Sequence, residues 1–212
     1  MGGPIYLSGA VRPDLNCAGF GFMRTSFIGN RFPLGATWAA DTGCFTQPKA
    51  FTVDRYLAWL RSHQSAQASC LFATAQDSVG NAALTLALSL PMLPAIRDLG
   101  YRAAFVGQDG IEWTQLPWNA FDAFFIGGST EWKLGPIARA YAFEAKARGK
   151  WLHMGRVNSL KRWRYAQSLG CDSVDGTYVA FGGDRNVARL KKWSALLRSQ
   201  LTLEQLTGIE VN

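Results

Sequence analysis

The sequence has few of the residues that bind metals or cross-link a chain. Four cysteines and two histidines are spread over 212 residues, and no two cysteines have C-x-x-C spacing. A structural zinc site needs such a ligand set, so we expect no zinc and no other cofactor. Scattered cysteines are not the framework of a disulfide-rich secreted domain, which favours a reducing, cytoplasmic setting.

Long apolar runs and targeting segments are also missing. The longest apolar stretch, 82–96, contains Pro91 and Pro94 and is shorter than the roughly 20 residues that span a bilayer. The first residues lack the basic start and apolar run of a signal peptide. No linker, repeat or low-complexity tract divides the chain. We therefore expect one domain over residues 1–212, with neither secretion nor a membrane partner.

Acidic residues are outnumbered. Lys and Arg together number 22 against 15 Asp and Glu, which gives a formal charge of +7. This charge permits a polyanionic partner, because each neutralised phosphate releases counterions. Many basic proteins bind no nucleic acid, so the net charge alone does not show whether this chain binds one.

What the sequence does contain is an alternation of short apolar runs with longer amphipathic ones. The short runs predict strands that are covered on both faces, at 5–7, 36–40, 70–74, 103–106, 123–126, 151–154 and 173–174. The longer runs predict helices at 53–65, 82–99, 136–148, 159–169 and 187–201.

This strand–helix order predicts an α/β fold of parallel strands joined by right-handed crossovers. Seven units favour a compact (βα)8 TIM-type barrel, with an open doubly wound sheet as the alternative. We expect the last strand at 178–181, although no helix fits between that segment and the preceding strand.

Polar or glycine clusters follow most of the predicted strands. In a barrel these clusters gather at the carboxyl face, where catalytic groups lie. The clusters occupy 41–43, 76–77, 107–110, 127–129, 154–156 and 175–177.

Two aspartates in these clusters suit a double displacement. One carboxylate attacks the anomeric carbon of a nucleoside and expels its base, while a second group handles protons on the leaving and arriving bases. Asp41 and Asp175 end different strands and are the candidates. An Asp beside Gly is more often a cap or a turn residue. Asp172 competes as nucleophile, but strand faces alternate, so it points away from the side of Asp175.

Recognition of a base requires polar groups against one edge of the ring and apolar surface on its faces. Asp77 can accept from an amino group and a ring N–H, and Gln108 offers both a donor and an acceptor. Glycines at 127–128 allow the backbone to approach closely. Phe45 and Met154 can sandwich the ring, although core packing is the simpler interpretation of either side chain alone.

These segments, in this order, resemble the motifs of queuine and archaeosine tRNA-guanine transglycosylases. Segment 40–45 resembles D-S-G-G-F, 105–110 resembles V-Q-G-G, and 125–128 resembles L-G-G. Segment 153–157 is similar to L-M-G-V-G, and 170–175 to G-x-D-x-F-D, whose last Asp is the nucleophile. The resemblance covers roughly residues 36 to 177, and it is the ordered set that makes it specific.

The resemblance implies a role for each matching residue. Asp175 would be the nucleophile and Asp41 the general base. The implied base-binding residues are Asp77, Gln108, Gly127, Gly128, Phe45, Met154 and Gly155.

The chain also departs from the tRNA enzymes. It lacks their C-x-C-x-x-C…H zinc segment, and Gly176-Thr177-Tyr178 stands where they have P-T-R. The chain is therefore more similar to the compact relatives in phages and bacterial islands that insert 7-deazaguanine derivatives into DNA. The resemblance implies DNA as the polymer (tRNA as the alternative) and a free 7-deazaguanine base as co-substrate, and it allows a homodimer. A phage enzyme would act in the host cytoplasm.

Basic and glycine residues provide candidate phosphate contacts. Lys161 and Arg162 begin one predicted helix, and Gly182, Gly183 and Arg185 precede the last one, where backbone amides can bind a phosphate. A solvated helix face and an ordinary turn are the competing interpretations. Two other functions stay open: a barrel acting on a small sugar phosphate, and a non-catalytic nucleic-acid-binding relative.

Overall fold

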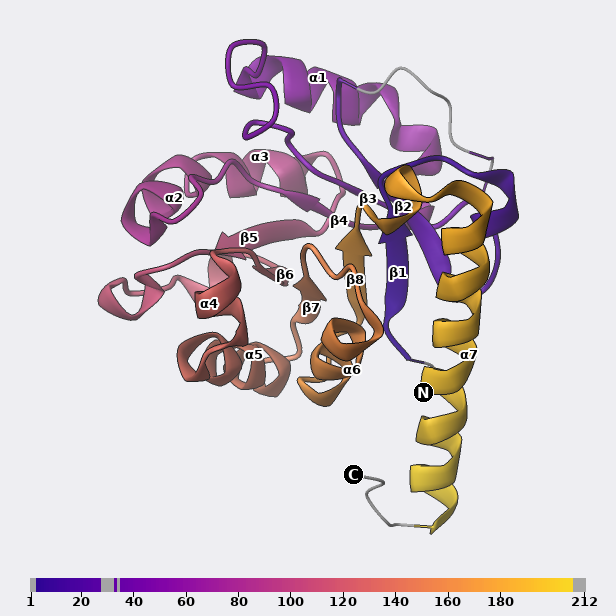
Figure 1. Ribbon diagram of the computed structural model, residues 1–212. Helices are drawn as coiled ribbons and strands as arrows, with labels where there is room; N and C mark the ends of the chain where they lie inside the picture. The colour runs from indigo at the N-terminus through magenta and orange to yellow at the C-terminus, as the bar shows by residue number, and fades with distance from the viewer. Residues whose placement is uncertain (1–2, 28–32, 34, 208–212) are drawn as a thin grey trace.

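The computed structural model describes residues 3–27, 33 and 35–207. Eight parallel strands close into a barrel in which each strand pairs with its neighbour in sequence and β8 pairs with β1 (Figure 1). This confirms the TIM-type barrel and excludes the open sheet. The strands are β1 (Ile5–Ser8), β2 (Phe20–Arg24), β3 (Trp38–Ala40), β4 (Cys70–Thr74), β5 (Ala103–Gly107), β6 (Ala123–Ile126), β7 (Trp151–Met154) and β8 (Ser173–Gly176).

The prediction for the eighth strand is wrong. Tyr178–Phe181 is a short 3-10 helix, η5, and the additional strand is β2, between the first two predicted strands. Only a 3-10 turn, η1 (Pro13–Leu15), lies between β1 and β2, so no amphipathic helix marks the crossover. Gly21 lets β2 fit, because a Cβ there would stand 2.5 Å from the carbonyl oxygen of Thr37.

Helices surround the barrel, and α7 runs past β1 along its side (Figure 1). The helices are α1 (Val53–Ser62), α2 (Ala82–Ser89), α3 (Met92–Asp98), α4 (Thr130–Leu134), α5 (Pro136–Ala147), α6 (Leu160–Ser168) and α7 (Gly183–Thr207). The remaining 3-10 turns are η2 (Gln64–Ser69), η3 (Ile111–Trp113) and η4 (Trp118–Ala120).

Local chemistry explains the ends of these helices. The side chains of Thr52, Asn81, Ser129 and Ser159 accept the N-cap hydrogen bonds of α1, α2, α4 and α6. The helix expected over 82–99 is divided into α2 and α3 at Pro91, whose nitrogen has no proton to donate. Within the described residues, no helix combines the length and apolar character that crossing a membrane would require.

Two apolar layers fix the direction of each strand side chain. Strand residues such as Leu7, Phe72 and Phe125 form a cluster without helix members, which is the barrel interior. The alternate strand residues pack with helix residues in a second, larger cluster. Because side chains alternate along a strand, this division places Asp175 toward the barrel interior and Val174 toward the helices.

Candidate active site

Five of the predicted site segments meet at one end of the barrel. Asp41 follows β3, Asp77 follows β4, and Gln108 follows β5, while 127–128 follow β6 and Asp175 lies near the end of β8. All eight strands are parallel, so these positions share the carboxyl end of the barrel, called the mouth below. Asp172 precedes β8 at the opposite end, which excludes it from the mouth.

Asp41 is half-buried beside two other carboxylates. Its Oδ1 accepts a hydrogen bond of 2.6 Å from the amide of Gly43. Burial raises the pKa of Asp41 to about 7, the negative charges of Asp77 and Asp175 act in the same direction, and the Gly43 bond opposes them. A carboxyl group with this pKa can give and take a proton near neutral pH, which is the requirement for general acid–base chemistry.

Asp77 and Gln108 form one hydrogen-bonded unit. Gln108 is 2% exposed, and its Nε2 donates to Oδ2 of Asp77 over 2.7 Å. Its Oε1 accepts from the amides of Gly80 (3.1 Å) and Gly128 (2.9 Å). Burial raises the pKa of Asp77 although Cys44 and Gln108 donate to its carboxylate. Gln108 therefore holds Asp77 in place and ties together the loops after β4 and β6.

The two glycines after β6 are required by space. A Cβ at Gly127 would stand 2.7 Å from Cγ1 of Val106, and one at Gly128, where φ is +58°, would overlap the ring of Trp132. Their amides are already used within the protein, since Gly127 donates to the carbonyl of Gly107 and Gly128 donates to Gln108. In this conformation the two glycines leave room for the neighbouring side chains of Val106 and Trp132, and their amides are not free donors.

Met154 does not face the mouth, which corrects the prediction that it stacks on the base. It is fully buried, and it pairs with Ile126 and Val174, which point toward the helices. The inward position next to it is Gly155, where a Cβ would lie 2.6 Å from the ring of Phe125 and 3.2 Å from Oδ1 of Asp175. The missing side chain at Gly155 thus lets the ring of Phe125 pack next to Asp175.

Phe45 lies in the loop after β3 with 72% of its surface exposed. A large apolar side chain in this position gains nothing from core packing. Its assignment as a stacking residue stays a prediction.

Asp175 has a partner that was absent from the predicted site. Nε2 of His153 lies 3.0 Å from Oδ1 of Asp175, and Nδ1 of His153 lies 2.8 Å from Oγ of Ser173. Burial lowers the pKa of His153, although the hydrogen bond and the charge of Asp175 oppose this effect. One oxygen of the Asp175 carboxylate is thus bonded to His153, while 19% of the side chain stays exposed at the mouth.

A buried lysine also belongs to the site and was missed in the sequence. Lys133 is 3% exposed, and its ammonium donates to the carbonyl of Gly155. Burial lowers its pKa to about 7, with the charge of Arg156 adding to the effect and that of Asp175 opposing it. Lys133 lies on α4, a five-residue helix that the apolar pattern did not reveal.

Arg156 carries unusual backbone geometry at the same end of the barrel. Its φ is +60°, the one positive value outside glycine among the described residues, and its guanidinium donates to the carbonyl of Gly128. Non-glycine residues in this region cluster at functional sites. Arg162 donates to the carbonyl of Arg156 over 3.3 Å, which connects α6 with the mouth.

The predicted phosphate contacts fall in two different places. Lys161 and Arg162 line a cavity of about 430 Å³ together with Leu134, Ser159 and Tyr165. Gly182, Gly183 and Arg185 lie at the start of α7, where the exposed carboxylate of Asp184 pairs with Arg12. The first place combines cations with an aromatic face close to the mouth, whereas the second also carries a negative charge.

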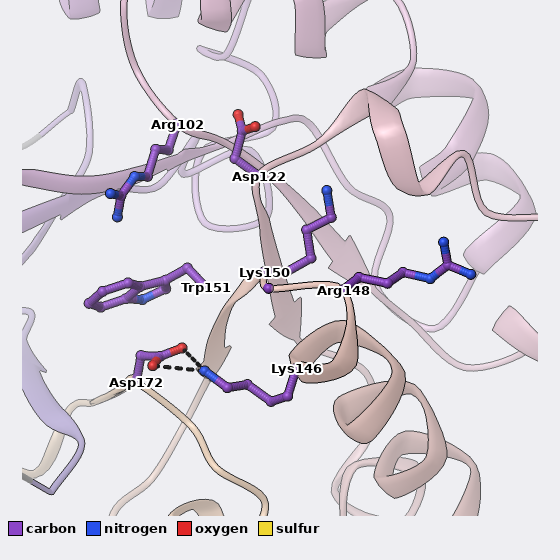
Figure 2. Close-up of a pocket in the computed structure, with 8 residues that line it drawn as sticks. Arg102, Asp122, Lys146, Arg148, Lys150, Trp151 and Asp172 are labelled. Atoms are coloured by element: carbon purple, nitrogen blue, oxygen red, sulfur yellow. Dashed lines mark hydrogen bonds and ion pairs between the residues drawn. The ribbon is translucent and has the colours of Figure 1, made fainter. Parts of the chain in front are cut away.

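The opposite end of the barrel holds another cavity, of about 440 Å³. Figure 2 shows its charged lining, with the ammonium of Lys146 bonded to both carboxylate oxygens of Asp172 at 2.9 and 2.8 Å. Asp122 is bonded twice to Arg97, at 3.0 and 2.7 Å. These pairs connect the helices α5 and α3 to the residues that precede β8 and β6.

Within the part of the chain that the structure describes, no group of three or more His, Cys, Asp or Glu residues is arranged to hold a metal ion.

Comparisons with known proteins add little to this geometry. No protein-family model matches the chain, and no curated protein matches it. A chain of the tryptophan synthase complex from Pyrococcus furiosus has 13% identity and a TM-score of 0.47, covering 82% of this chain and 66% of that chain. The PaMucR phosphodiesterase, solved with c-di-GMP, has 14% identity and a TM-score of 0.39, covering 68% and 66%. Likeness at this level carries no argument about activity.

Proposed function

We propose that this barrel is a base-exchange transglycosylase, which replaces guanine in DNA with a 7-deazaguanine derivative. The observation that carries the proposal is the pair of aspartates at the mouth. Asp41 has a pKa of about 7, raised by its burial and by the charges of Asp77 and Asp175. Asp175 has one carboxylate oxygen bonded to His153 and part of its surface open. One group suits proton transfer and the other suits nucleophilic attack.

The proposed reaction has two balanced halves. In the first, an oxygen of Asp175 attacks C1′ of the guanine nucleotide, and the C1′–N9 bond breaks. Its electron pair stays on the base, which takes a proton from the carboxyl group of Asp41. In the second, N9 of the incoming 7-deazaguanine attacks C1′ and gives its proton to the carboxylate of Asp41. The ester bond to Asp175 breaks, and two displacements restore the configuration at C1′.

Asp77 is the proposed acceptor for the base edge. Its carboxylate is fixed by Gln108 and lies near enough to Asp41 to influence its ionisation. A guanine-like edge presents an amino group and a ring N–H, which suit the two oxygens of one carboxylate. The exposed Phe45 is the proposed cover for the ring face.

Lys161 and Arg162 are the proposed contacts to the DNA backbone. They line the cavity between α4 and α6, and Arg162 is connected to the mouth through Arg156. Tyr165 adds an aromatic face on which a neighbouring base can stack. DNA is proposed over tRNA on the resemblance to the compact DNA-modifying relatives.

Exchange of labelled guanine tests the proposal. Purified protein is incubated with labelled guanine and either duplex DNA, single-stranded DNA or tRNA, and the label retained in the polymer is counted. We expect label in DNA, and loss of it in Asp175→Asn. Asp172→Asn is the matched control, since it removes a carboxylate from the other end of the same strand.

Two results would contradict parts of the proposal. Label in tRNA alone would exclude DNA as the polymer. Label in DNA that survives Asp175→Asn would exclude Asp175 as the nucleophile. If neither polymer is labelled while a small sugar phosphate raises the melting temperature, the sugar-phosphate barrel would replace the proposal.

A further inference from the structure

A continuous row of hydrogen bonds crosses the interior of the barrel and ends on the proposed nucleophile. Nε1 of Trp151 donates to Oγ of Ser173 over 2.9 Å. Oγ of Ser173 lies 2.8 Å from Nδ1 of His153, and Nε2 of His153 lies 3.0 Å from Oδ1 of Asp175. The row starts at Trp151, which lines the cavity at the amino end (Figure 2), and finishes at the mouth.

The two ends of the row set the directions of its protons: the carboxylate of Asp175 can only accept, so Nε2 of His153 donates to it. An indole N–H can only donate, so Ser173 accepts from it and has its own hydroxyl proton left to donate. A neutral imidazole that carries its proton on Nε2 has no proton on Nδ1, so Nδ1 accepts and the hydroxyl proton of Ser173 supplies that hydrogen bond. Asp175 then receives a hydrogen bond from a neutral N–H donor.

The surroundings of His153 keep it neutral and immobile. Its side chain is fully buried, and the rings of Phe72 and Phe125 lie 5.0 and 4.4 Å from its own between centroids. Burial lowers the pKa of His153, and Lys133 adds to this effect while Asp175 opposes it. The imidazole is therefore kept neutral, and the two phenylalanine rings leave it no space to flip.

We propose that Trp151, Ser173 and His153 are positioning residues that fix His153 in its Nε2–H tautomer, hold Oδ1 of Asp175, and leave Oδ2 to attack the sugar. The proposal rests on the proposed function for the role of Asp175. The tautomer itself does not depend on that function, so the two can fail separately.

Nitrogen NMR on the full-length protein, labelled with ¹⁵N-histidine, reads the tautomer without any substrate. The chain contains two histidines, and His153→Gln assigns the signal of His153 by its loss. We expect a protonated Nε2 and an unprotonated Nδ1 at pH 7. A proton on Nδ1, or an imidazolium at pH 7, would overturn the proposal whether or not the protein exchanges bases.

Kinetics of base exchange tests the positioning role. In His153→Gln the amide N–H₂ can reach Asp175, whereas His153→Leu has a similar size and no donor. Loss of a hydrogen bond to a charged group predicts that Leu lowers kcat about 10- to 100-fold. We expect KM for DNA to change less than about threefold, because the row lies beneath the nucleophile and away from the bound polymer. Gln should restore most of kcat.

Comparing kcat of the two variants, once each is shown to be folded, separates a positioning role from a merely structural one. Gln and Leu both disturb the buried ring contacts of His153, so a merely structural role would lower kcat equally in both variants. Equal kcat in two folded variants, whether low or near wild type, would overturn the proposal. Should the Leu variant not fold, Ser173→Ala takes its place: we expect about a threefold to tenfold lower kcat from the loss of one neutral hydrogen bond, and an unchanged kcat would overturn the row beyond His153.

Discussion

The aspartates at the two ends of the barrel lie in opposite surroundings. At the amino end, Asp122 and Asp172 are each bonded twice to one cation, Arg97 and Lys146 respectively. Each also accepts a backbone N–H, from Ala103 in one case and Leu152 in the other. Both carboxylates there are therefore matched by a cation and by a backbone donor.

At the mouth, three carboxylates stand close together with neutral partners. Asp41 accepts from a backbone amide, Asp77 from an amide and a thiol, and Asp175 from an imidazole. Within the described residues, none of these three carboxylates forms an ion pair with a lysine or an arginine.

The different partners at the two ends shift the pKa values of Asp122 and Asp41 in opposite directions. Burial tends to raise the pKa of Asp122, but the bonds from Arg97 and Ala103 outweigh it and lower the pKa. Burial raises the pKa of Asp41 to about 7, and the effect that opposes it is a hydrogen bond from a neutral amide. Asp122 at the amino end is therefore stabilised as a carboxylate, whereas burial at the mouth favours the protonated form of Asp41, which suits acid–base chemistry.

The largest expected effect distinguishes Asp175, near the carboxyl end of β8, from Asp172, which precedes β8 at the amino end. Asp175→Asn should lower base exchange by about 10⁴-fold or more, because the covalent intermediate cannot form. Asp172→Asn should leave exchange within about threefold and lower the free energy of unfolding by about 1 kcal/mol, as expected for a partly exposed ion pair. Exchange assays and urea denaturation measure both. Similar loss of exchange in both variants would remove the distinction between the ends.

Asp41→Asn should lower exchange by about 10²- to 10⁴-fold by removing the proton carrier. In the wild type, exchange should be fastest near pH 7, because one half-reaction needs the protonated carboxyl group and the other the carboxylate. A pH–rate profile checks this. A wild-type rate that is flat from pH 5 to 9 would contradict the assignment.

The substitution Asp41→Asn should also raise the free energy of unfolding in alkaline solution. The folded protein keeps the proton on Asp41 up to about pH 7, while an unfolded chain loses it near the ordinary pKa of about 4. Asp41 therefore costs stability increasingly between pH 4 and 7, and fully above pH 7. Asp41→Asn should raise the free energy of unfolding by on the order of 2 kcal/mol at pH 8, allowing for partial exposure. At pH 4 the two proteins should unfold alike, and a gain at pH 4 equal to that at pH 8 would contradict the account.

Asp122→Asn should have the opposite sign. The lowered pKa of Asp122 means that its carboxylate stabilises the fold above the ordinary pKa and that this contribution is lost as the pH falls through the folded value. Because the side chain is about a third exposed, we expect a loss of about 1 kcal/mol at pH 7. Chemical denaturation at pH 7 and at pH 3 compares the two conditions, and a larger loss at pH 3 would contradict the sign.

A last comparison, which involves no ionisable group, sets two glycines with positive φ against each other, one at each end of the barrel. At Gly149, where φ is +67°, a Cβ would meet no atom within 4 Å, so Gly149→Ala should cost about 1 kcal/mol of backbone strain. Gly128→Ala adds an overlap with Trp132 and should cost about 3 kcal/mol in total. Thermal denaturation measures both, and equal costs would mean that the loop after β6 yields easily.

Much of the barrel could be predicted because parallel strands buried on both faces are recognisable apolar runs. The strand β2 was missed for two physical reasons. Its crossover from β1 contains a 3-10 turn in place of an amphipathic helix, and its sequence contains Gly21 and ends in Arg24. The position of Asp41 and Asp175 at strand ends was predictable because the chain order of a βα barrel brings all such ends together.

The direction of side chains on β7 could not be predicted. Its residues Trp151–Met154 are apolar or aromatic on both faces except for one histidine, so no alternation shows which side faces the interior. The register with β8 decides it, and it turns His153 inward and Met154 outward. Lys133 was hidden for a different reason, since a helix of five residues is too short to show a period.

Direct detection of the sugar on Asp175 tests the central claim. The protein is mixed with a guanine-containing oligodeoxynucleotide, quenched in detergent and digested, and the peptides are analysed by mass spectrometry. The account predicts a deoxyribose-linked peptide that contains Asp175, present in Asp172→Asn and missing in Asp175→Asn. Base exchange without such an adduct, or an adduct on Asp41, would contradict it.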